Sequence, residues 1–170
     1  MKRLVQIATL ISFLTLSAGQ VFAAGENKLY LGIGAARVSV SDSAFDDSDN
    51  KFNFLVGWMF NQHIGLEGGY YDLGDYSTGT NSSKNTAVTL GTLISFPVEK
   101  AAIYGKLGVA SRDTEINLGG VAATDDTSTE IYAGVGVELR GEDIGVYLEY
   151  LVFDGVLEVD VIGLGLKVRF

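Results

Sequence analysis

The chain of 170 residues contains no cysteine, one proline and one histidine. Without cysteine it can form no disulfide and carry no acylated cysteine, so an exported form must be held by hydrogen bonds and packing and is not a lipoprotein. The scarcity of proline suits long strands, because proline interrupts the hydrogen-bond ladder of a sheet. The lone histidine, His63, falls in an expected turn and leaves little basis for Ser–His chemistry. We therefore predict that the chain has no catalytic residue and is not an enzyme.

Basic residues are also few. The chain has 12 Lys and Arg residues against 21 Asp and Glu residues. Removing Lys2 and Arg3 with the leader described below leaves 10 against 21, a net charge near −11. Such an acidic surface repels phosphates, so we predict no nucleic-acid partner. Beyond residue 23, no stretch reaches the roughly 18 consecutive apolar residues of a spanning helix.

The first residues have the layout of a secretory signal peptide. Lys2 and Arg3 precede a mostly apolar stretch over residues 4–16, and Ala23 offers a small residue for cleavage. We predict that residues 1–23 are removed and that residues 24–170 form one domain. The alternative is an N-terminal membrane anchor, but the apolar stretch is shorter than the ~18–20 residues that a spanning helix needs.

Apolar residues alternate with small or polar ones along eight segments of the chain. In residues 51–60, for example, Phe52, Phe54 and Val56 share one face, whereas Asn53 and Gly57 lie opposite. These lengths match the ~9–11 residues of a tilted membrane strand and exceed the ~5–6 residues of a typical soluble strand. The segments are residues 28–40, 51–60, 64–76, 85–96, 102–112, 129–140, 144–153 and 157–170.

The predicted connections alternate between short and long. Residues 61–63, 97–100 and 141–143 are short turns, whereas residues 41–50, 77–84 and 114–128 are longer and polar. The connection near Asp154 and Gly155 is a short exception on the long side. Short turns on one side and longer loops on the other are typical of bacterial outer membrane barrels, in which the long loops face outward.

The two faces of the segments differ in charge. One face carries glycines together with nearly all the strand charges, and the other is almost free of charge, as contact with lipid requires. In a narrow barrel, small residues and paired charges would fill the interior. The predicted lumen charge network comprises Glu67, Lys106, Glu138, Glu149, Lys167 and Arg169. A soluble periplasmic lipocalin-like or sandwich domain is the alternative, with the apolar face inside.

Aromatic residues gather near the predicted strand ends, where they suit the two membrane interfaces. The predicted interface aromatics are Trp58, Phe60, Tyr70, Phe96 and Tyr150, and the last alternating segment ends in Phe170. Closure into a ring removes the unpaired strand edges that a bilayer interior does not tolerate. We therefore predict an all-β fold, an eight-stranded antiparallel up-and-down transmembrane β-barrel in the outer membrane.

The chain also resembles the transmembrane domain of outer membrane protein A and its small porin-like relatives. The resemblance rests on the order and spacing of residues 30–34, 56–58, 64–70, 103–108, 137–139, 148–150 and 168–170. It implies that Phe170 helps the barrel-assembly machinery to recognise the chain, and that acidic and basic side chains close the lumen. Leu93 and Tyr147 stand where the family often has a basic residue, so Lys167 and Arg169 are expected to supply that charge.

Other candidate sites have simpler interpretations. Residues 46–50, DDSDN, offer oxygen ligands for calcium but lack the glycine and distal glutamate of an EF-hand loop, so a solvated loop tip is favoured. The lumen charges could line an ion path, but an eight-stranded barrel is just wide enough to be filled by its side chains, which favours a plug. We predict no metal site and no cofactor.

These features favour a structural and surface-interaction protein. It would contact outer membrane lipid and lipopolysaccharide and present acidic loops to an extracellular ligand. The main alternative is a narrow, low-conductance porin or small-solute channel. A lipid-modifying barrel enzyme is disfavoured by the position of His63.

Overall fold

The computed structural model describes residues 28–40, 49–78, 81–118, 121–155 and 159–170. The predicted signal peptide and most of the acidic stretch 46–50 lie outside these residues. Among the residues described, no helix combines the length and apolar character that crossing a membrane requires. The strands are β1 Lys28–Val40, β2 Asp49–Met59, β3 Ile64–Thr78, β4 Asn81–Val98, β5 Ala101–Leu118, β6 Val121–Arg140, β7 Ile144–Asp154 and β8 Val159–Arg169.

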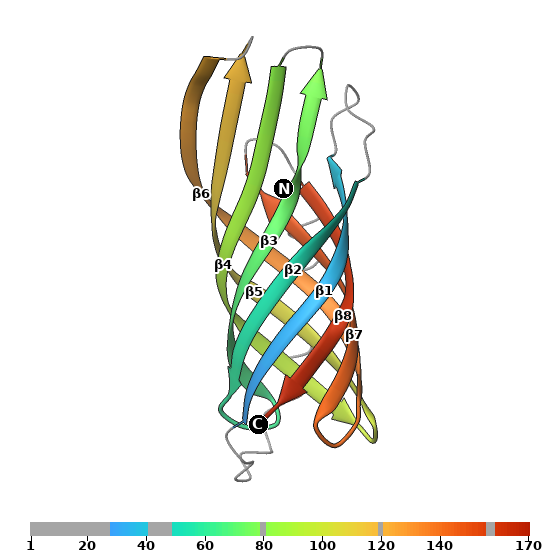
Figure 1. Ribbon diagram of the computed structural model, residues 1–170. Helices are drawn as coiled ribbons and strands as arrows, with labels where there is room; N and C mark the ends of the chain where they lie inside the picture. The colour runs from blue at the N-terminus through green and yellow to red at the C-terminus, as the bar shows by residue number, and fades with distance from the viewer. Residues whose placement is uncertain (1–27, 41–48, 79–80, 119–120, 156–158) are drawn as a thin grey trace.

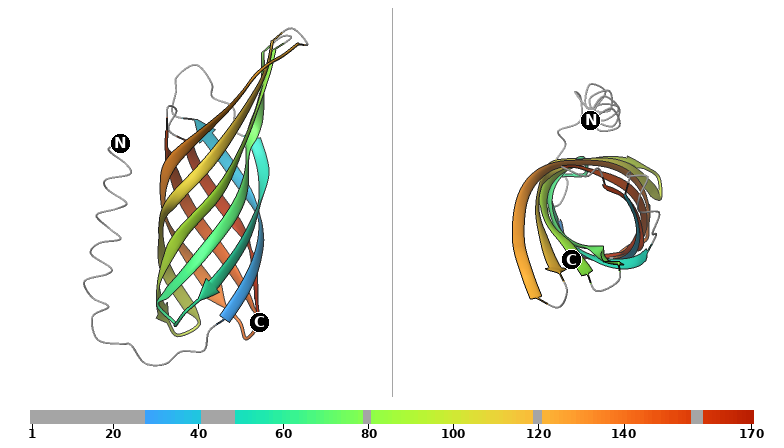
Figure 2. Two further views of the ribbon diagram at one scale, coloured as in Figure 1. Left: turned by 90° about the vertical axis from the view of Figure 1, so that its left-hand side faces the viewer. Right: turned by 90° about the horizontal axis from the view of Figure 1, so that it is seen from above.

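The strands close into a barrel. Each strand pairs antiparallel with the next, and β1 pairs with β8 from Tyr30↔Arg169 to Val40↔Val159. Seen from above, the ribbons form a ring (Figure 2). Since the β1–β8 ladder joins the ends of the sheet, backbone groups in the barrel wall find partners within the wall. The prediction of an eight-stranded antiparallel barrel is confirmed.

Side chains alternate between the lumen and the outside. On β1, Tyr30 is 2% exposed, whereas its neighbour Leu31 is 50% exposed. The same alternation on the other strands leaves a belt of half-exposed Leu, Ile, Val and Phe side chains around the barrel. A belt of this size is far larger than the apolar patches of soluble monomers, and it suits contact with lipid. The faces therefore have the predicted orientation and not that of the soluble alternative.

Two predicted loops are wrong. Residues 77–84 and 114–128 belong mostly to strands, and only residues 79–80 and 119–120 separate β3 from β4 and β5 from β6. Pairing continues far along both hairpins, to Thr78↔Asn81 and Leu118↔Val121. Sequences rich in Ser, Thr, Asn and Asp resemble loops. Outside a bilayer both faces of a strand can be polar, so the backbone ladder forms there without apolar alternation.

The outer parts of β3, β4, β5 and β6 form a four-stranded extension that stands above the rest of the barrel (Figures 1 and 2). β2 pairs with β3 only as far as Asn53↔Tyr71, and β7 pairs with β6 only as far as Ile131↔Asp154. The register shifts between Asp72 and Gly74, where the extension leaves the barrel. Gly74 has a φ of 107°, which a residue with a side chain rarely adopts. We call this end of the barrel the extension end and the opposite end the turn end.

Candidate functional site in the barrel lumen

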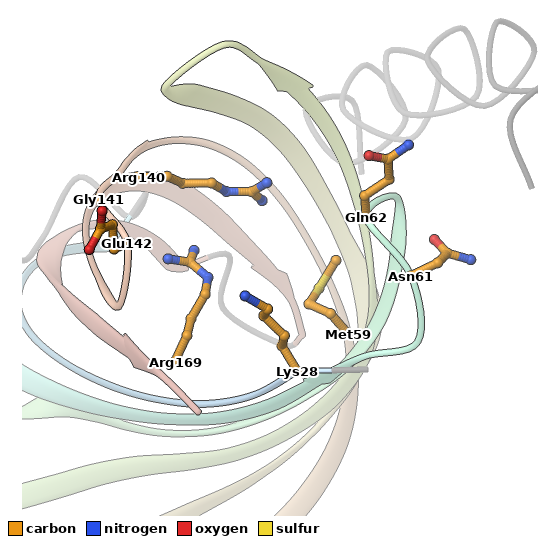
Figure 3. A pocket seen from close by; sticks show the side chains of 8 residues that line it. All are labelled: Lys28, Met59, Asn61, Gln62, Arg140, Gly141, Glu142 and Arg169. Atoms are coloured by element: carbon orange, nitrogen blue, oxygen red, sulfur yellow. The ribbon is translucent and has the colours of Figure 1, made fainter. Parts of the chain in front are cut away.

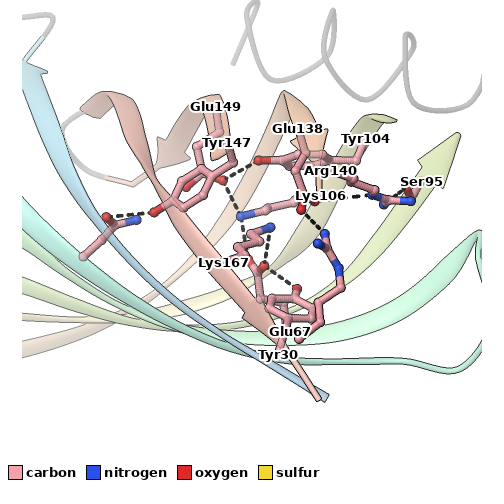
Figure 4. A network of polar contacts seen from close by, with 12 residues as sticks. Tyr30, Glu67, Ser95, Tyr104, Lys106, Glu138, Arg140, Tyr147, Glu149 and Lys167 are labelled. Carbon is pink, nitrogen blue, oxygen red and sulfur yellow. Dashed lines mark hydrogen bonds and ion pairs between the residues drawn. The ribbon is translucent and has the colours of Figure 1, made fainter. Parts of the chain in front are cut away.

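Charged side chains enter the lumen at three levels. Arg112 and Glu130 pair at 3.5 Å near the extension end, and Glu138 lies between Arg140 and Arg169 at the turn end, where the lumen opens into a pocket (Figure 3). Between these two levels lies the central layer, defined here as Glu67, Lys106, Glu149 and Lys167 (Figure 4). The structure thus divides the six predicted network residues between the central layer and the turn end.

The central layer joins β3, β5, β7 and β8 across the lumen. Lys106 Nζ lies 2.5 Å from Glu67 Oε1 and 2.5 Å from Glu149 Oε2. Lys167 Nζ lies 3.3 Å from Glu67 Oε2. All four residues are buried, and the two ammonium groups balance the two carboxylates. Burial of ions is tolerated only when they are paired and hydrogen-bonded, and this layer meets that condition.

Tyrosines complete the hydrogen bonding of the central layer. The hydroxyl of Tyr30 donates to Glu67 at 2.5 Å, and those of Tyr71 and Tyr104 donate to Glu149 at 3.2 and 3.1 Å. Sequence reasoning missed these residues, although each falls on the same alternating face as the charges. That shared face was a usable signal.

Lys167 also lies against three rings. Its Nζ is 4.9, 4.7 and 5.1 Å from the ring centroids of Tyr30, Tyr104 and Tyr147, within cation–π range. Tyr147 and Leu93, the two departures from the family pattern, both face the lumen and are buried. The ammonium of Lys167 therefore occupies a space walled by tyrosine rings as well as by Glu67.

Aromatic rings fill the lumen beyond the central layer, toward the extension end. The Phe153 ring stacks on Tyr132 at 5.7 Å between centroids and meets Tyr71 edge-on at 5.9 Å. Leu73 and Leu151 are fully buried in the same cluster. Rings and charged groups together occupy the middle of the lumen, as expected for eight strands.

At the turn end, one carboxylate serves two guanidinium groups. Arg169 Nη2 donates to Glu138 Oε1, and Arg140 Nε lies 3.7 Å from Glu138 Oε2. Arg140 Nη2 also donates to Ser95 Oγ at 2.8 Å. Sequence reasoning missed Arg140, although it lies two residues beyond Glu138 and so shares its face.

The predicted interface aromatics divide by position. Trp58, Phe60 and Phe96 lie near the turn end, where the Trp58 and Phe60 rings are 5.6 Å apart. Tyr70 lies beside Phe52 of the neighbouring strand, with 6.2 Å between the ring centroids. Tyr70 and Tyr150 are each the seventh residue of their strand, β3 and β7, counted from the turn end, so the two lie at similar levels and their place at an interface stays a prediction. A tyrosine on the outer face satisfies the alternation at any height, so the pattern did not fix its level.

The remaining candidates lie at the turn end. His63 Nδ1 is 3.0 Å from the carbonyl oxygen of Ser95, in the turn between β2 and β3. The Phe170 N–H donates to the Leu29 carbonyl at 2.9 Å, and its side chain is 70% exposed. In the part of the chain that the structure describes, no group of three His, Cys, Asp or Glu residues could hold a metal ion.

Comparison with protein families decides the identity. A family model described as the outer membrane protein beta-barrel domain matches residues 7–170. The chain belongs to this family. Membership of this family places the barrel in the outer membrane. Since outer membrane barrels have short periplasmic turns and longer outer connections, its turn end is periplasmic and its extension faces outward.

Solved structures share the fold. Neisserial surface protein A is 16% identical with a TM-score of 0.70, and the match covers 85% of this chain and all (100%) of that protein. Ail of Yersinia pestis is 19% identical with a TM-score of 0.65, over 85% of this chain and 99% of Ail. OprG from Pseudomonas aeruginosa is 15% identical with a TM-score of 0.64, over 87% and 98%. No curated protein sequence matches the chain significantly.

Replacing Lys106 tests whether the central layer holds the barrel together. In Lys106→Met, Glu149 loses its ion pair and Glu67 keeps only Lys167. We expect the free energy of unfolding to fall by about 3–5 kcal/mol, because an uncompensated buried carboxylate remains. Urea unfolding of the barrel in lipid vesicles, followed by the gel mobility shift between folded and heated protein, measures this change.

Two further variants control the Lys106 experiment. Lys100→Met removes the same charge from an exposed turn and should change stability by less than about 0.5 kcal/mol. Adding Glu149→Gln to Lys106→Met removes the orphaned carboxylate and should restore part of the loss. Equal stability of Lys106→Met and the unmodified protein would contradict the role of the central layer.

Proposed function

We propose that this protein is an outer membrane anchor with a plugged lumen, and that its four-stranded extension contacts partners outside the cell. The observation that carries the proposal is the placement of its longest strands. β4, β5 and β6 have 18, 18 and 20 residues, against 11 in β7 and β8. The additional length lies in the extension, and a barrel that served only to cross the membrane would not need it.

The filled lumen supports an anchor over a pore or an enzyme. The side chains of the central layer and the aromatic rings beside it fill the middle of the barrel. A catalytic role for His63 is disfavoured, because it lies at the periplasmic turn end and not near the outer face. The apolar belt would contact membrane lipid, with lipopolysaccharide in the outer leaflet.

The composition of the extension favours a cationic partner. Residues 72–87 and 110–130 contain the acidic residues Asp72, Asp75, Asp113, Glu115, Asp125, Asp126 and Glu130 and the basic residues Lys84 and Arg112. Excess negative charge attracts basic surfaces and repels polyanions. Ail has been crystallised with the heparin analogue sucrose octasulfate. We propose the opposite preference for this chain.

Conductance separates the anchor from the alternative, a narrow channel. The charged levels along the lumen are the feature that favours the channel. We expect no discrete current steps when the purified protein is inserted in a planar bilayer, because the central layer and the aromatic rings block the path. Reproducible single-channel steps, abolished by heating the protein before insertion, would favour the channel instead.

Shortening the extension tests its role in binding. Asn-Gly turns would replace residues 75–84 and 113–127, joining Gly74 to Asn85 and Arg112 to Ser128, which are already paired. The shortened barrel should keep its gel mobility shift. We expect vesicles carrying the full-length protein to bind a surface coated with a cationic peptide, less so as salt rises, and the shortened protein to lose this binding.

A heparin-coated surface is the control for the extension experiment. Preferential binding of the full-length protein to heparin would contradict the proposed charge preference. Equal binding of both proteins to the cationic surface would remove the extension from the interaction.

Phe170 is proposed to act as the signal for the barrel-assembly machinery. Its exposed ring at the end of the last strand supports this role, since a partner can reach it. Phe170→Ala should lower the amount of heat-shifted protein in the outer membrane fraction, whereas protein refolded in detergent should be unaffected. Normal recovery in cells would contradict the proposal.

A further inference from the structure

The periplasmic mouth of the lumen holds a pocket of about 260 Å³. Three cationic side chains, Lys28, Arg140 and Arg169, line it from β1, β6 and β8. Asn61 and Gln62 of the β2–β3 turn and Glu142 of the β6–β7 turn form part of its rim. Figure 3 shows the three cationic side chains reaching from separate strands into the same opening. The pocket is therefore accessible from the periplasm and lined by positive groups.

Charge balance distinguishes this mouth from the central layer. In the central layer, two lysines face two glutamates. At the mouth, Glu138 is the one carboxylate paired with both Arg140 and Arg169. Two guanidinium groups thus share one carboxylate at the mouth, in a chain whose net charge is −9.

The two guanidinium groups also have donors to spare. Each guanidinium offers five N–H donors. Arg140 Nη2 donates to Ser95, and Arg169 Nη2 donates to Glu138. Arg140 Nε and Arg169 Nη1 are buried and make no hydrogen bond within the described protein. Arg140 Nε faces Glu138 Oε2 at 3.7 Å, so the donors left for a further acceptor are the remaining N–H groups of the two guanidinium groups.

We propose that the periplasmic mouth binds a small phosphate-bearing anion. Guanidinium groups bind phosphate oxygens with paired, charge-assisted hydrogen bonds, and the mouth brings two such groups together beside the ammonium group of Lys28. The volume admits inorganic phosphate or the headgroup of a phospholipid from the inner leaflet of the outer membrane. Both sources present the same chemistry to Arg140 and Arg169.

Binding of inorganic phosphate to the purified barrel tests the free-anion source. Titration calorimetry in a non-ionic, phosphate-free detergent would compare the unmodified protein with Arg140→Gln. Arg140 is preferred to Arg169 because its contact with Glu138 is longer, so the variant disturbs the ion pair less. We expect Arg140→Gln to weaken binding at least about tenfold, as loss of a charged hydrogen bond implies.

Vesicles test the headgroup source. The temperature of the gel mobility shift would be measured in phosphatidylcholine with and without phosphatidylglycerol. If the anionic headgroup occupies the mouth, phosphatidylglycerol raises this temperature for the unmodified protein and not for Arg140→Gln. A response to either probe that depends on Arg140 supports the site and identifies its source.

Two variants keep the test decisive. Lys100→Gln removes a charge from the exposed β4–β5 turn at the same end, outside the pocket, and should retain binding. Arg140→Lys keeps the charge but loses the fork geometry, so it should bind with intermediate strength even if Arg140→Gln fails to fold. Absence of both responses, or equal loss in Lys100→Gln and Arg140→Gln, would overturn the proposal.

Discussion

The hydrogen-bond ladder between β1 and β8 is the constraint on which the rest of the structure depends. A sheet in lipid must close, because no water is present to satisfy an open edge. Closure of eight strands then fixes a narrow interior. Every second residue points into that interior, so the chain must fill it with side chains of suitable size and charge. The apolar belt outside and the polar lumen inside are two results of one closed ladder.

The lumen shows how buried charge is made tolerable. Desolvated ions are costly unless paired with good geometry, and the central layer satisfies its carboxylates with both ammonium groups and tyrosine hydroxyls. The turn end is arranged differently, because two guanidinium groups pair with the single carboxylate of Glu138 and the site is open to water. A sealed layer must balance its own charge, whereas an open mouth can take a counterion from solution.

Alternation in the sequence predicts those parts of the fold that lie in the bilayer. The bounds of β1 and the inward direction of Glu67 and Lys106 follow from period-two spacing, because lipid demands an apolar face there. The extension could not be found in this way, since water accepts polar residues on both faces of a strand. The level of Tyr150 and the pairing of Glu138 with Arg169 depend on register between strands, which is a property of the closed sheet and not of one segment.

The unequal strand lengths give the barrel an oblique rim. β3 to β6 rise beyond the level at which β2 and β7 stop pairing with them, so the wall is high on one side and low on the other (Figure 2). A barrel with a level rim presents the same outline from every direction in the membrane plane, whereas the outline of this barrel differs between its high side and its low side. Lateral neighbours therefore meet different surfaces according to how the barrel is rotated about the membrane normal.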